Sequence, residues 1–388
     1  MINTAIKTKF YLAPHVYYTK NERGSFMLYN TDTGERIESD SISCRNLIER
    51  IYEPANLGVI DMEENFMDNE TDGFIKEIIA KKFGKIIEQK EGAPQYINLL
   101  PILNLQSDME RLKIDKESSP GEDLIKYLNE LNLYINDDDD NLNLSTIKSL
   151  LDSLNYSQLS RINMHSDNVF SYSLFPELLS LLKEYHFDYH FWNNYVNFVD
   201  SKLIDHNYSY DVNISFPIRT EPLIRCLELL EENKAHYHFY ITSEKEYEEA
   251  ESLINDFEIN SYSFHPVYAG DNLRFFEENV YLSEEDIFED VIPFRHIFRN
   301  QKLNSNYFGK LYILPDGSVK ASKNSPILGN LKNNSILEII YNELELNTAW
   351  RKVRDGYPCN QCLYQFLCPP PSDHEIVIGK NNLCHINP

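Results

Sequence analysis

The 388 residues are enough for two or three domains, each with its own hydrophobic core. Hydrophobic residues make up 42% of the chain and no run of eighteen apolar residues occurs, so the composition predicts a globular protein without a transmembrane helix. The formal net charge of −25 argues against nucleic acid and anionic membranes as partners, because like charges repel. The sequence begins MINTAIKTKF without the apolar segment of a secretory signal, and we therefore expect a cytoplasmic protein with reduced cysteines.

Residues 1–95 have the pattern of a small module in which strands precede helices. The expected strands cover residues 11–18, 25–29, 35–39 and 58–60, and the expected helices cover residues 44–51 and 74–83. Ser41 or Ser43 is suited to cap the first helix, and Gly84 is suited to end the second. Three strands followed by helices predict a winged-helix-like unit with an exposed sheet edge. Such an edge can accept an extended peptide as an extra strand, although an ordinary β-ribbon explains residues 10–29 on pattern alone.

Residues 96–126 form a connector that contains Pro101, Pro120 and Gly121, and strands and helices then alternate over residues 127–295. Strand patterns lie at residues 131–135, 160–164, 189–198, 211–216, 236–242 and 262–268, and helix patterns at 144–154, 175–185, 222–232 and 244–257. We expect the first of these helices to be capped by Asn143 or Ser145. Alternation of this kind is typical of a parallel sheet covered by helices, and about six repeats predict an α/β fold with a partial β/α barrel.

Two polar features of this region allow more than one interpretation. The acidic run at residues 137–140 offers the hard oxygen ligands that calcium or magnesium prefers, but it lacks the alternating ligand spacing and the glycine of an EF-hand loop. A solvated acidic loop is the favoured interpretation. His236 and His238 alternate along one strand, so both side chains are expected to point into the barrel. They are interpreted as a polar lining with satisfied imidazoles, with a metal or acid–base pair as the alternative.

Residues 296–388 differ in kind and end in a cysteine-rich tail. A strand at residues 311–314 and a turn at 315–317 are followed by a helix expected at 335–350. Cys359, Cys362, Cys368 and Cys384 then lie in a C-x2-C-x5-C-x15-C arrangement. Two ligands separated by two residues reach one centre from a single tight turn, and four thiolates suit a zinc ion or an iron–sulfur cluster. The sequence therefore predicts a closed four-cysteine metal site.

The other candidate ligands are expected to play lesser roles. His385 follows Cys384 directly and is an alternative ligand, but a role beside the site or at the surface is favoured. Cys44 and Cys226 are solitary, and each lies among apolar residues. Both are expected to be small core residues.

Three regions together resemble peptide-modifying radical-AdoMet maturases that carry a C-terminal SPASM domain. Residues 1–95 look like their leader-peptide-recognition element, residues 127–295 like their partial β/α barrel, and residues 296–388 like the SPASM domain. The segment Cys368-Pro369-Pro370-Pro371-Ser372, and the stretch from Ile378 to His385, are closer still to pseudo-radical-SAM partner proteins. Such partners are found beside maturases of small Bacteroidales natural-product precursors.

The departures from the family pattern decide what the resemblance implies. The family holds its catalytic cluster with a C-x3-C-x2-C triplet after the first barrel strand, and no such triplet occurs in this sequence. The Gly-Gly-Glu-Pro segment that contacts AdoMet in the family is replaced by residues 165–168, which contain no glycine. Ser372 and a position near Ser322 stand where the first auxiliary cluster has cysteines. The resemblance therefore implies a degenerate barrel that does not cleave AdoMet and retains only the second auxiliary 4Fe–4S cluster, on Cys359, Cys362, Cys368 and Cys384.

The function implied is that of a non-catalytic accessory protein in the maturation of a ribosomally synthesised peptide. Its expected partners are the leader of the precursor peptide and the cognate radical SAM maturase, and its expected cofactor is one 4Fe–4S cluster, with one zinc ion as the alternative. Two other functions remain open. The chain can be a redox enzyme or electron-relay protein that uses the single cluster, or a zinc-stapled structural adaptor.

Overall fold

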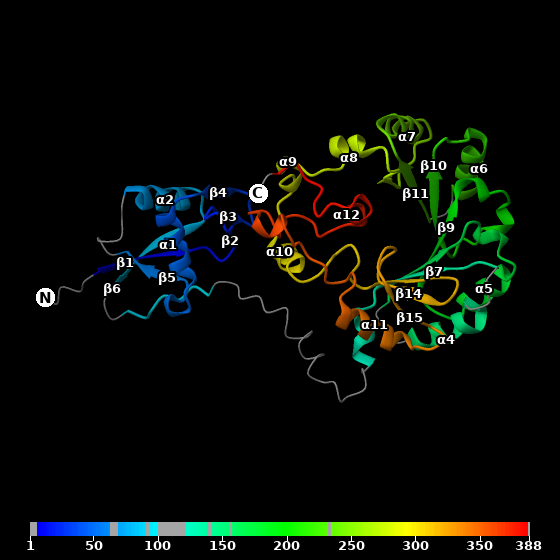
Figure 1. Ribbon diagram of the computed structural model, residues 1–388, viewed down its shortest axis with the longest axis horizontal. Helices are drawn as coiled ribbons and strands as arrows, with labels where there is room; N and C mark the ends of the chain where they lie inside the picture. Colours follow the sequence, from blue (N-terminus) through cyan, green and yellow to red (C-terminus); the bar gives the residue numbers. More distant parts are fainter. Residues whose placement is uncertain are drawn as a thin grey trace.

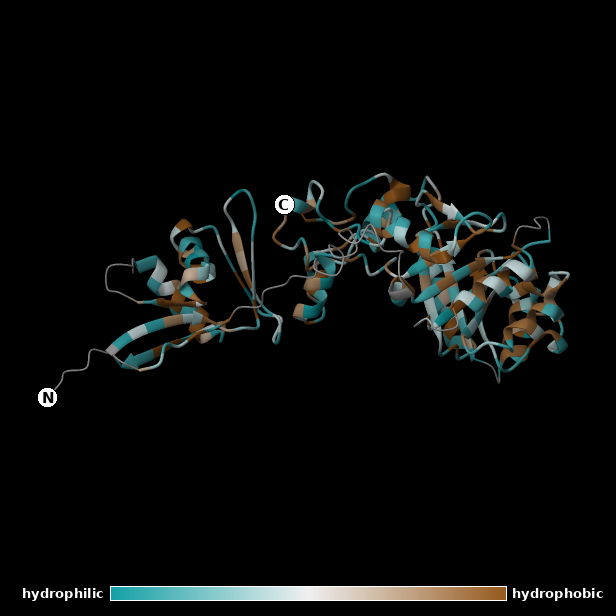
Figure 2. Cartoon of the chain, turned by 90° about the horizontal axis from the view of Figure 1, so that it is seen from below, coloured by the Kyte–Doolittle hydropathy of each residue, from teal (hydrophilic) through white to brown (hydrophobic). Residues whose placement is uncertain are grey.

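The computed structural model describes residues 6–62, 69–90, 93–99, 122–137, 142–154, 157, 159–231 and 234–386. The N-terminal module and the large β/α unit lie at opposite ends of the molecule, and the C-terminal segment lies between them (Figure 1). The bands of brown and teal along strands and helices in Figure 2 reflect the amphipathic patterns that the sequence predicts. Most of the expected connector, residues 100–121, lies outside the described residues, as do residues 138–140 of the acidic run.

The N-terminal module contains two antiparallel three-stranded sheets and two helices. Its elements are β1 (Ile6–Leu12), β2 (Val16–Lys20), β3 (Phe26–Asn30), β4 (Arg36–Ser39), α1 (Ile42–Tyr52), β5 (Val59–Asp61), α2 (Asn69–Ala80) and β6 (Gly84–Lys90). One sheet has the order β5-β1-β6 and the other β2-β3-β4. Both contribute to one core with α1 and α2, and Ser41 caps α1 by accepting a hydrogen bond from the backbone of Cys44.

Two predictions for this module are wrong. The single strand expected at residues 11–18 is broken between β1 and β2, where Pro14 has no N–H to donate to a sheet. Gly84 does not end a helix, because α2 ends at Ala80 and Gly84 begins the strand β6, which the sequence analysis missed. A Cβ atom at Gly84 would lie 2.5 Å from the carbonyl oxygen of Tyr11, so the close approach of β1 requires glycine there.

The large unit is built on a nine-stranded sheet in the order β12-β11-β10-β9-β8-β7-β13-β14-β15. The six parallel strands that alternate with helices are β7 (Glu130–Tyr134), β8 (Arg161–His165), β9 (Asp188–Asn194), β10 (Ser209–Ser215), β11 (Lys234–Ile241) and β12 (Tyr262–Pro266). The helices between them are α4 (Leu144–Leu154), α5 (Phe175–Leu182), α6 (Thr220–Leu230) and α7 (Glu244–Asp256). These confirm the expected alternation of strands and helices and the large parallel sheet, with shifts of a few residues at the boundaries. Asn143 caps α4, since its side chain accepts from the backbone N–H of Thr146.

The sheet continues across residue 296, where a new domain was expected. β13 (Lys310–Ile313) pairs in parallel with β7, and β14 (Ser318–Lys320) and β15 (Ile327–Asn330) extend it antiparallel. The following helix α11 (Ile336–Leu346) has a capping box on Ser335 and ends at Leu346, four residues earlier than expected, with the left-handed Asn347 as its C-cap. The remaining helices are α8 (Leu273–Asn279), α9 (Glu284–Ile287), α10 (Phe294–Asn300) and α12 (Asp373–Ile378). Short 3-10 turns lie at Pro54–Asn56, Glu122–Tyr127, Val169–Ser171, Tyr195–Asn197, Ser201–Leu203 and Cys359–Gln361.

Candidate functional site

The four tail cysteines line one small pocket. Cys359 opens a 3-10 turn, Cys362 and Cys368 follow it, and Cys384 returns beside Leu282 in a parallel bridge. Burial raises the pKa of the Cys359 and Cys362 thiols, and it raises the pKa of Cys368 to about 12. A bound cation would be needed to keep these sulfurs as thiolates at neutral pH.

Four cysteine sulfurs around one pocket are a donor set that fits an iron–sulfur cluster or a zinc ion. Within the described ranges, no three His, Cys, Asp or Glu side chains are already grouped closely enough to hold one metal ion. The metal site at these cysteines stays a prediction.

Hydrogen-bond donors surround the sulfur atoms. The amide of Asn382 lies 3.0 Å from the sulfur of Cys384, and the backbone N–H of Tyr364 lies 3.4 Å from that of Cys362. The guanidinium of Arg354 lies 3.8 Å from the sulfur of Cys359 and pairs with Glu375 at 2.7 Å. Such donors favour negatively charged sulfur ligands.

The lesser candidates occupy separate places. His385 is engaged elsewhere, because its Nε2 lies 2.8 Å from the backbone oxygen of Glu277. Cys44 and Cys226 are buried in the cores of the module and the large unit, as predicted. Ser372 caps α12.

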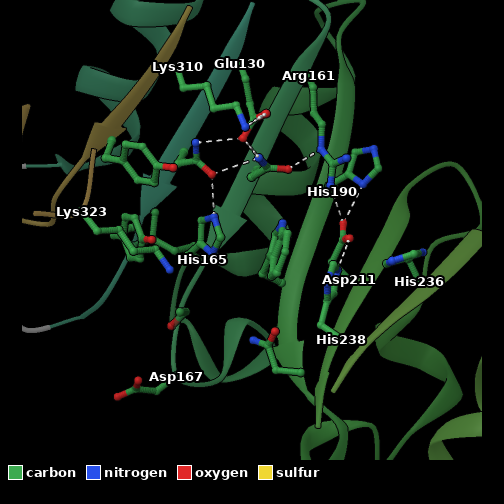
Figure 3. Close-up of a pocket in the computed structure, with 18 of the residues that line it drawn as sticks. Glu130, Arg161, His165, Asp167, His190, Asp211, His236, His238, Lys310 and Lys323 are labelled. Carbon is green, nitrogen blue, oxygen red and sulfur yellow. Dashed lines mark hydrogen bonds and ion pairs between the residues drawn. The ribbon is translucent and has the colours of Figure 1, made fainter. Parts of the chain in front are cut away.

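The interior of the open barrel is a second candidate site, with a cavity of about 950 Å³ (Figure 3). Side chains alternate along each parallel strand, so that Leu131 and Leu133 pack under the helices while Glu130, Asn132 and Tyr134 face the cavity. The same polar-inward alternation holds along β8 to β11. Five of the chain's eleven histidines line the cavity: His165, His190, His236, His238 and His265.

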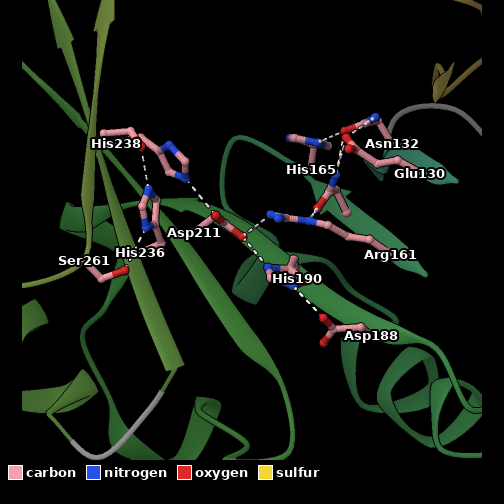
Figure 4. Close-up of polar contacts among 12 residues, drawn as sticks. Glu130, Asn132, Arg161, His165, Asp188, His190, Asp211, His236, His238 and Ser261 are labelled. Carbon is pink, nitrogen blue, oxygen red and sulfur yellow. Dashed lines mark hydrogen bonds and ion pairs between the residues drawn. The ribbon is translucent and has the colours of Figure 1, made fainter. Parts of the chain in front are cut away.

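Asp211 is the centre of the polar network in this cavity (Figure 4). Its carboxylate is buried and accepts from His190 Nδ1 and His238 Nε2, both at 2.7 Å, and from Arg161 Nη2 at 2.9 Å. Burial alone would raise the pKa of Asp211, but the two histidine hydrogen bonds and the Arg161 charge hold it well below its usual range. Asp211 is therefore a fixed negative charge.

The predicted lining histidines are satisfied as expected. His236 contacts the hydroxyls of Ser261 and Ser263, each at 2.8 Å. His238 bridges Asp211 and His265, the latter at 2.8 Å. Both line the cavity, which confirms the predicted polar lining.

A second network fixes His165 at the end of β8. Its Nε2 lies 3.0 Å from the amide oxygen of Asn132, which also accepts from Asn163. The ring is stacked between Tyr134, with centroids 4.6 Å apart, and Trp192, at 5.1 Å. Burial, followed by the charge of Lys323, lowers the pKa of His165 to about 3. The imidazole is neutral at physiological pH.

Of these residues, only His236 and His238 are predicted from the sequence as part of the lining. Asp211, Arg161, His190 and His265 each lie on a different strand, so no local spacing connects them. The available signal was the repeated placement of polar residues at every second position of strands that are otherwise hydrophobic.

Comparison with known proteins gives structural similarities at low sequence identity. No protein-family model matches it, and no curated protein is significantly similar. Among solved structures, Streptococcus suis SuiB bound to S-adenosylmethionine is 13% identical, covering 97% of this chain and 99% of SuiB with a TM-score of 0.40. SuiB bound to its precursor peptide SuiA is 12% identical over the same shares, with a TM-score of 0.42. A heterocyclase in complex with substrate and cofactor is 12% identical, covering 45% of this chain and 21% of that chain, with a TM-score of 0.13. Similarities this low do not establish a shared activity.

No helix in the described part of the chain is long and apolar enough to cross a membrane.

Proposed function

We propose that this protein is an accessory factor in the maturation of a ribosomally made peptide, which it binds by strand addition without cleaving AdoMet. The observation that carries the proposal is the outer edge of β4 in the N-terminal module. Within the described residues β4 pairs only with β3, so its other edge is open. An open edge offers main-chain hydrogen bonds to an extended peptide, while neighbouring side chains select its sequence.

The register of β4 identifies which backbone groups face outward. The backbone N–H of Asn30 donates to the carbonyl of Glu35, so Asn30 and Glu35 are a hydrogen-bonded pair. Leu28 and Ile37 are the pair two residues away along the two strands. Because hydrogen-bonded pairs alternate in antiparallel sheets, the backbone of Ile37 faces β3 and that of Glu38 faces away. The Glu38 N–H is therefore a donor for an added strand.

The β4 side chains connect this edge to the cysteine segment. The hydroxyl of Tyr364, between Cys362 and Cys368, donates to Glu38 at 2.9 Å and to Glu284 at 3.3 Å. Arg36 pairs with Glu284. These contacts support a connection between the β4 side chains and the segment that carries the cysteines.

We infer that the barrel does not perform radical chemistry, since the sequence has no C-x3-C-x2-C triplet. The cysteine tail would hold one 4Fe–4S cluster on Cys359, Cys362, Cys368 and Cys384, which supplies one-electron transfer when bound. The large unit would then present a docking face for the active maturase.

Peptide binding is tested with the full chain and fluorescently labelled leader peptides of candidate short precursors. We expect saturable anisotropy, weakened roughly five- to tenfold in Glu38→Pro, which removes one outward N–H. Glu38→Ala is the matched control: it loses the same side-chain contact with Tyr364 but keeps the N–H. No saturable binding, or equal binding by the two variants, would contradict strand addition at β4.

The metal and the missing radical chemistry are tested separately. Protein purified without oxygen is assayed for iron, zinc and acid-labile sulfide, beside Cys362→Ala. About four iron and four sulfide per chain, lost in the variant, support the cluster, whereas one zinc without sulfide supports the adaptor alternative. Formation of 5′-deoxyadenosine from AdoMet under reducing conditions would refute the proposal that this protein does not cleave AdoMet.

A further inference from the structure

The C-terminal ends of the parallel strands carry groups that the proposed function does not use. In β/α folds ligands bind at this end of the sheet. His265 lies near the end of β12, level with Tyr240 of β11. Lys323 follows β14 and lines the same cavity (Figure 3).

A hydrogen-bonded relay connects His265 to the buried Asp211. An ionised carboxylate can only accept, so His238 carries its proton on Nε2, 2.7 Å from Asp211. The lone pair of a neutral His238 is then on Nδ1, 2.8 Å from His265 Nε2. His265 therefore donates from Nε2 and keeps its own lone pair on Nδ1. No partner for that Nδ1 lies in the described part of the chain, and the ring lines the cavity.

A cation and flat rings complete the surroundings of His265. Lys323 forms no ion pair with a described residue, and its charge lowers the pKa of both His165 and His265. All three side chains line the same cavity. Tyr240 stacks on His265 with centroids 5.1 Å apart. Burial, followed by the charges of His238, His236, Lys323 and His374, lowers the pKa of His265 to about 4.

We propose that the barrel interior is a general-base site for a planar ligand. His265 Nδ1 removes a proton, and Lys323 stabilises the oxyanion that forms. The C–H or O–H bond of the ligand breaks, its proton moves to Nδ1, and its electron pair moves to an oxygen beside Lys323. The imidazolium then returns the proton to product or water, so no oxidant, reductant or metal is needed. Asp211 and His238 act as positioning residues that keep Nδ1 unprotonated.

The probe is 5-nitrobenzisoxazole, a planar molecule that needs only a base. Loss of its ring C–H breaks the N–O bond and gives a coloured phenolate, whose oxygen is the developing oxyanion. The full chain is assayed at pH 7.5 without AdoMet or peptide, so a negative result leaves the proposed peptide binding untouched. We expect His265→Ala to lower the rate of the wild-type protein about 100-fold or more. The exposed His206→Ala, outside the cavity, is the control and should react as wild type.

Two further variants separate chemistry from folding. Asp211→Asn keeps the shape of the side chain, but its amide can donate a hydrogen bond to His238 Nε2. His238 then carries its proton on Nδ1 and donates to His265 Nε2, so that the proton of His265 lies on Nδ1. We expect about the same loss as in His265→Ala, with the native circular dichroism spectrum retained. Lys323→Met, at an exposed position, should lower the rate about tenfold or more without affecting folding. A wild-type rate no higher than that of His265→Ala, or unchanged rates in both Asp211→Asn and Lys323→Met, would overturn the proposal.

Discussion

Mild acid should destabilise this protein through His165. The pKa of His165 is lowered to about 3 in the folded chain from an ordinary value of 6.5, mainly by burial. Because the folded-state pKa is depressed, the unfolded state binds the proton first. Stability is complete above pH 6.5 and is lost as the pH falls towards 3. pH 5.0 lies 1.5 units below the ordinary pKa of 6.5, and each unit costs about 1.36 kcal/mol of stability. The free energy of unfolding therefore falls by about 2 kcal/mol through this one side chain.

The assay is urea unfolding of the full chain at pH 7.5 and pH 5.0, with and without His165→Gln. The variant loses the stacked ring at both pH values, so that cost cancels when the two are subtracted. Both proteins should lose stability between pH 7.5 and pH 5.0. We expect the loss of unfolding free energy to be about 2 kcal/mol smaller in His165→Gln than in the wild type. The exposed His206→Gln should behave as wild type. If His165→Gln lost as much stability as the wild type over this range, the neutral, buried imidazole would be refuted.

Three other predictions concern buried polar groups in the C-terminal region. Glu343 is fully buried and accepts hydrogen bonds from the backbone N–H groups of Thr348, Ala349 and Trp350. Glu343→Ala should therefore lower the free energy of unfolding in urea by about 3 kcal/mol or more, and Glu343→Gln is the milder control. Arg354→Met leaves the 5% exposed Glu375 without its cation and should lower the free energy of unfolding by about 3–5 kcal/mol. The double variant Arg354→Met, Glu375→Gln removes both charges and should recover much of this stability. Tyr364→Phe keeps the buried ring but removes the hydroxyl bond to β4, so it should accelerate hydrogen exchange in β4 by an amount equivalent to about 1 kcal/mol.

Local pattern was sufficient to predict the alternating strands and helices of the large unit. The apolar positions of α4, Ile147, Leu150, Leu151 and Leu154, recur at helical spacing and are all buried. In the N-terminal module, by contrast, β6 has no clear strand pattern in its sequence, and only its first residue is buried. It is a strand because β1 pairs along its whole length, a long-range contact that no local window contains.

The candidate site in the barrel was less predictable for a physical reason. The carboxylate of Asp211 and the two imidazoles that donate to it are adjacent only because parallel strands bring residues 190, 211 and 238 together. The four cysteines were easier to identify because three of them lie within ten residues of one another. Their common pocket still required the return of the tail to Leu282, which places Cys384 beside the others.

The polar interior of the barrel bears on whether the large unit is only a scaffold. Closed eight-stranded β/α barrels are filled by layers of branched apolar side chains, which stabilise the fold at no cost in desolvated charge. Here the buried Asp211 is held by three donors, and the cavity beside it remains about 950 Å³. Replacing such a network by apolar residues is often neutral or stabilising, so stability alone does not require it. The general-base site proposed above does require it, because Asp211 holds His238 in the tautomer that leaves His265 Nδ1 unprotonated.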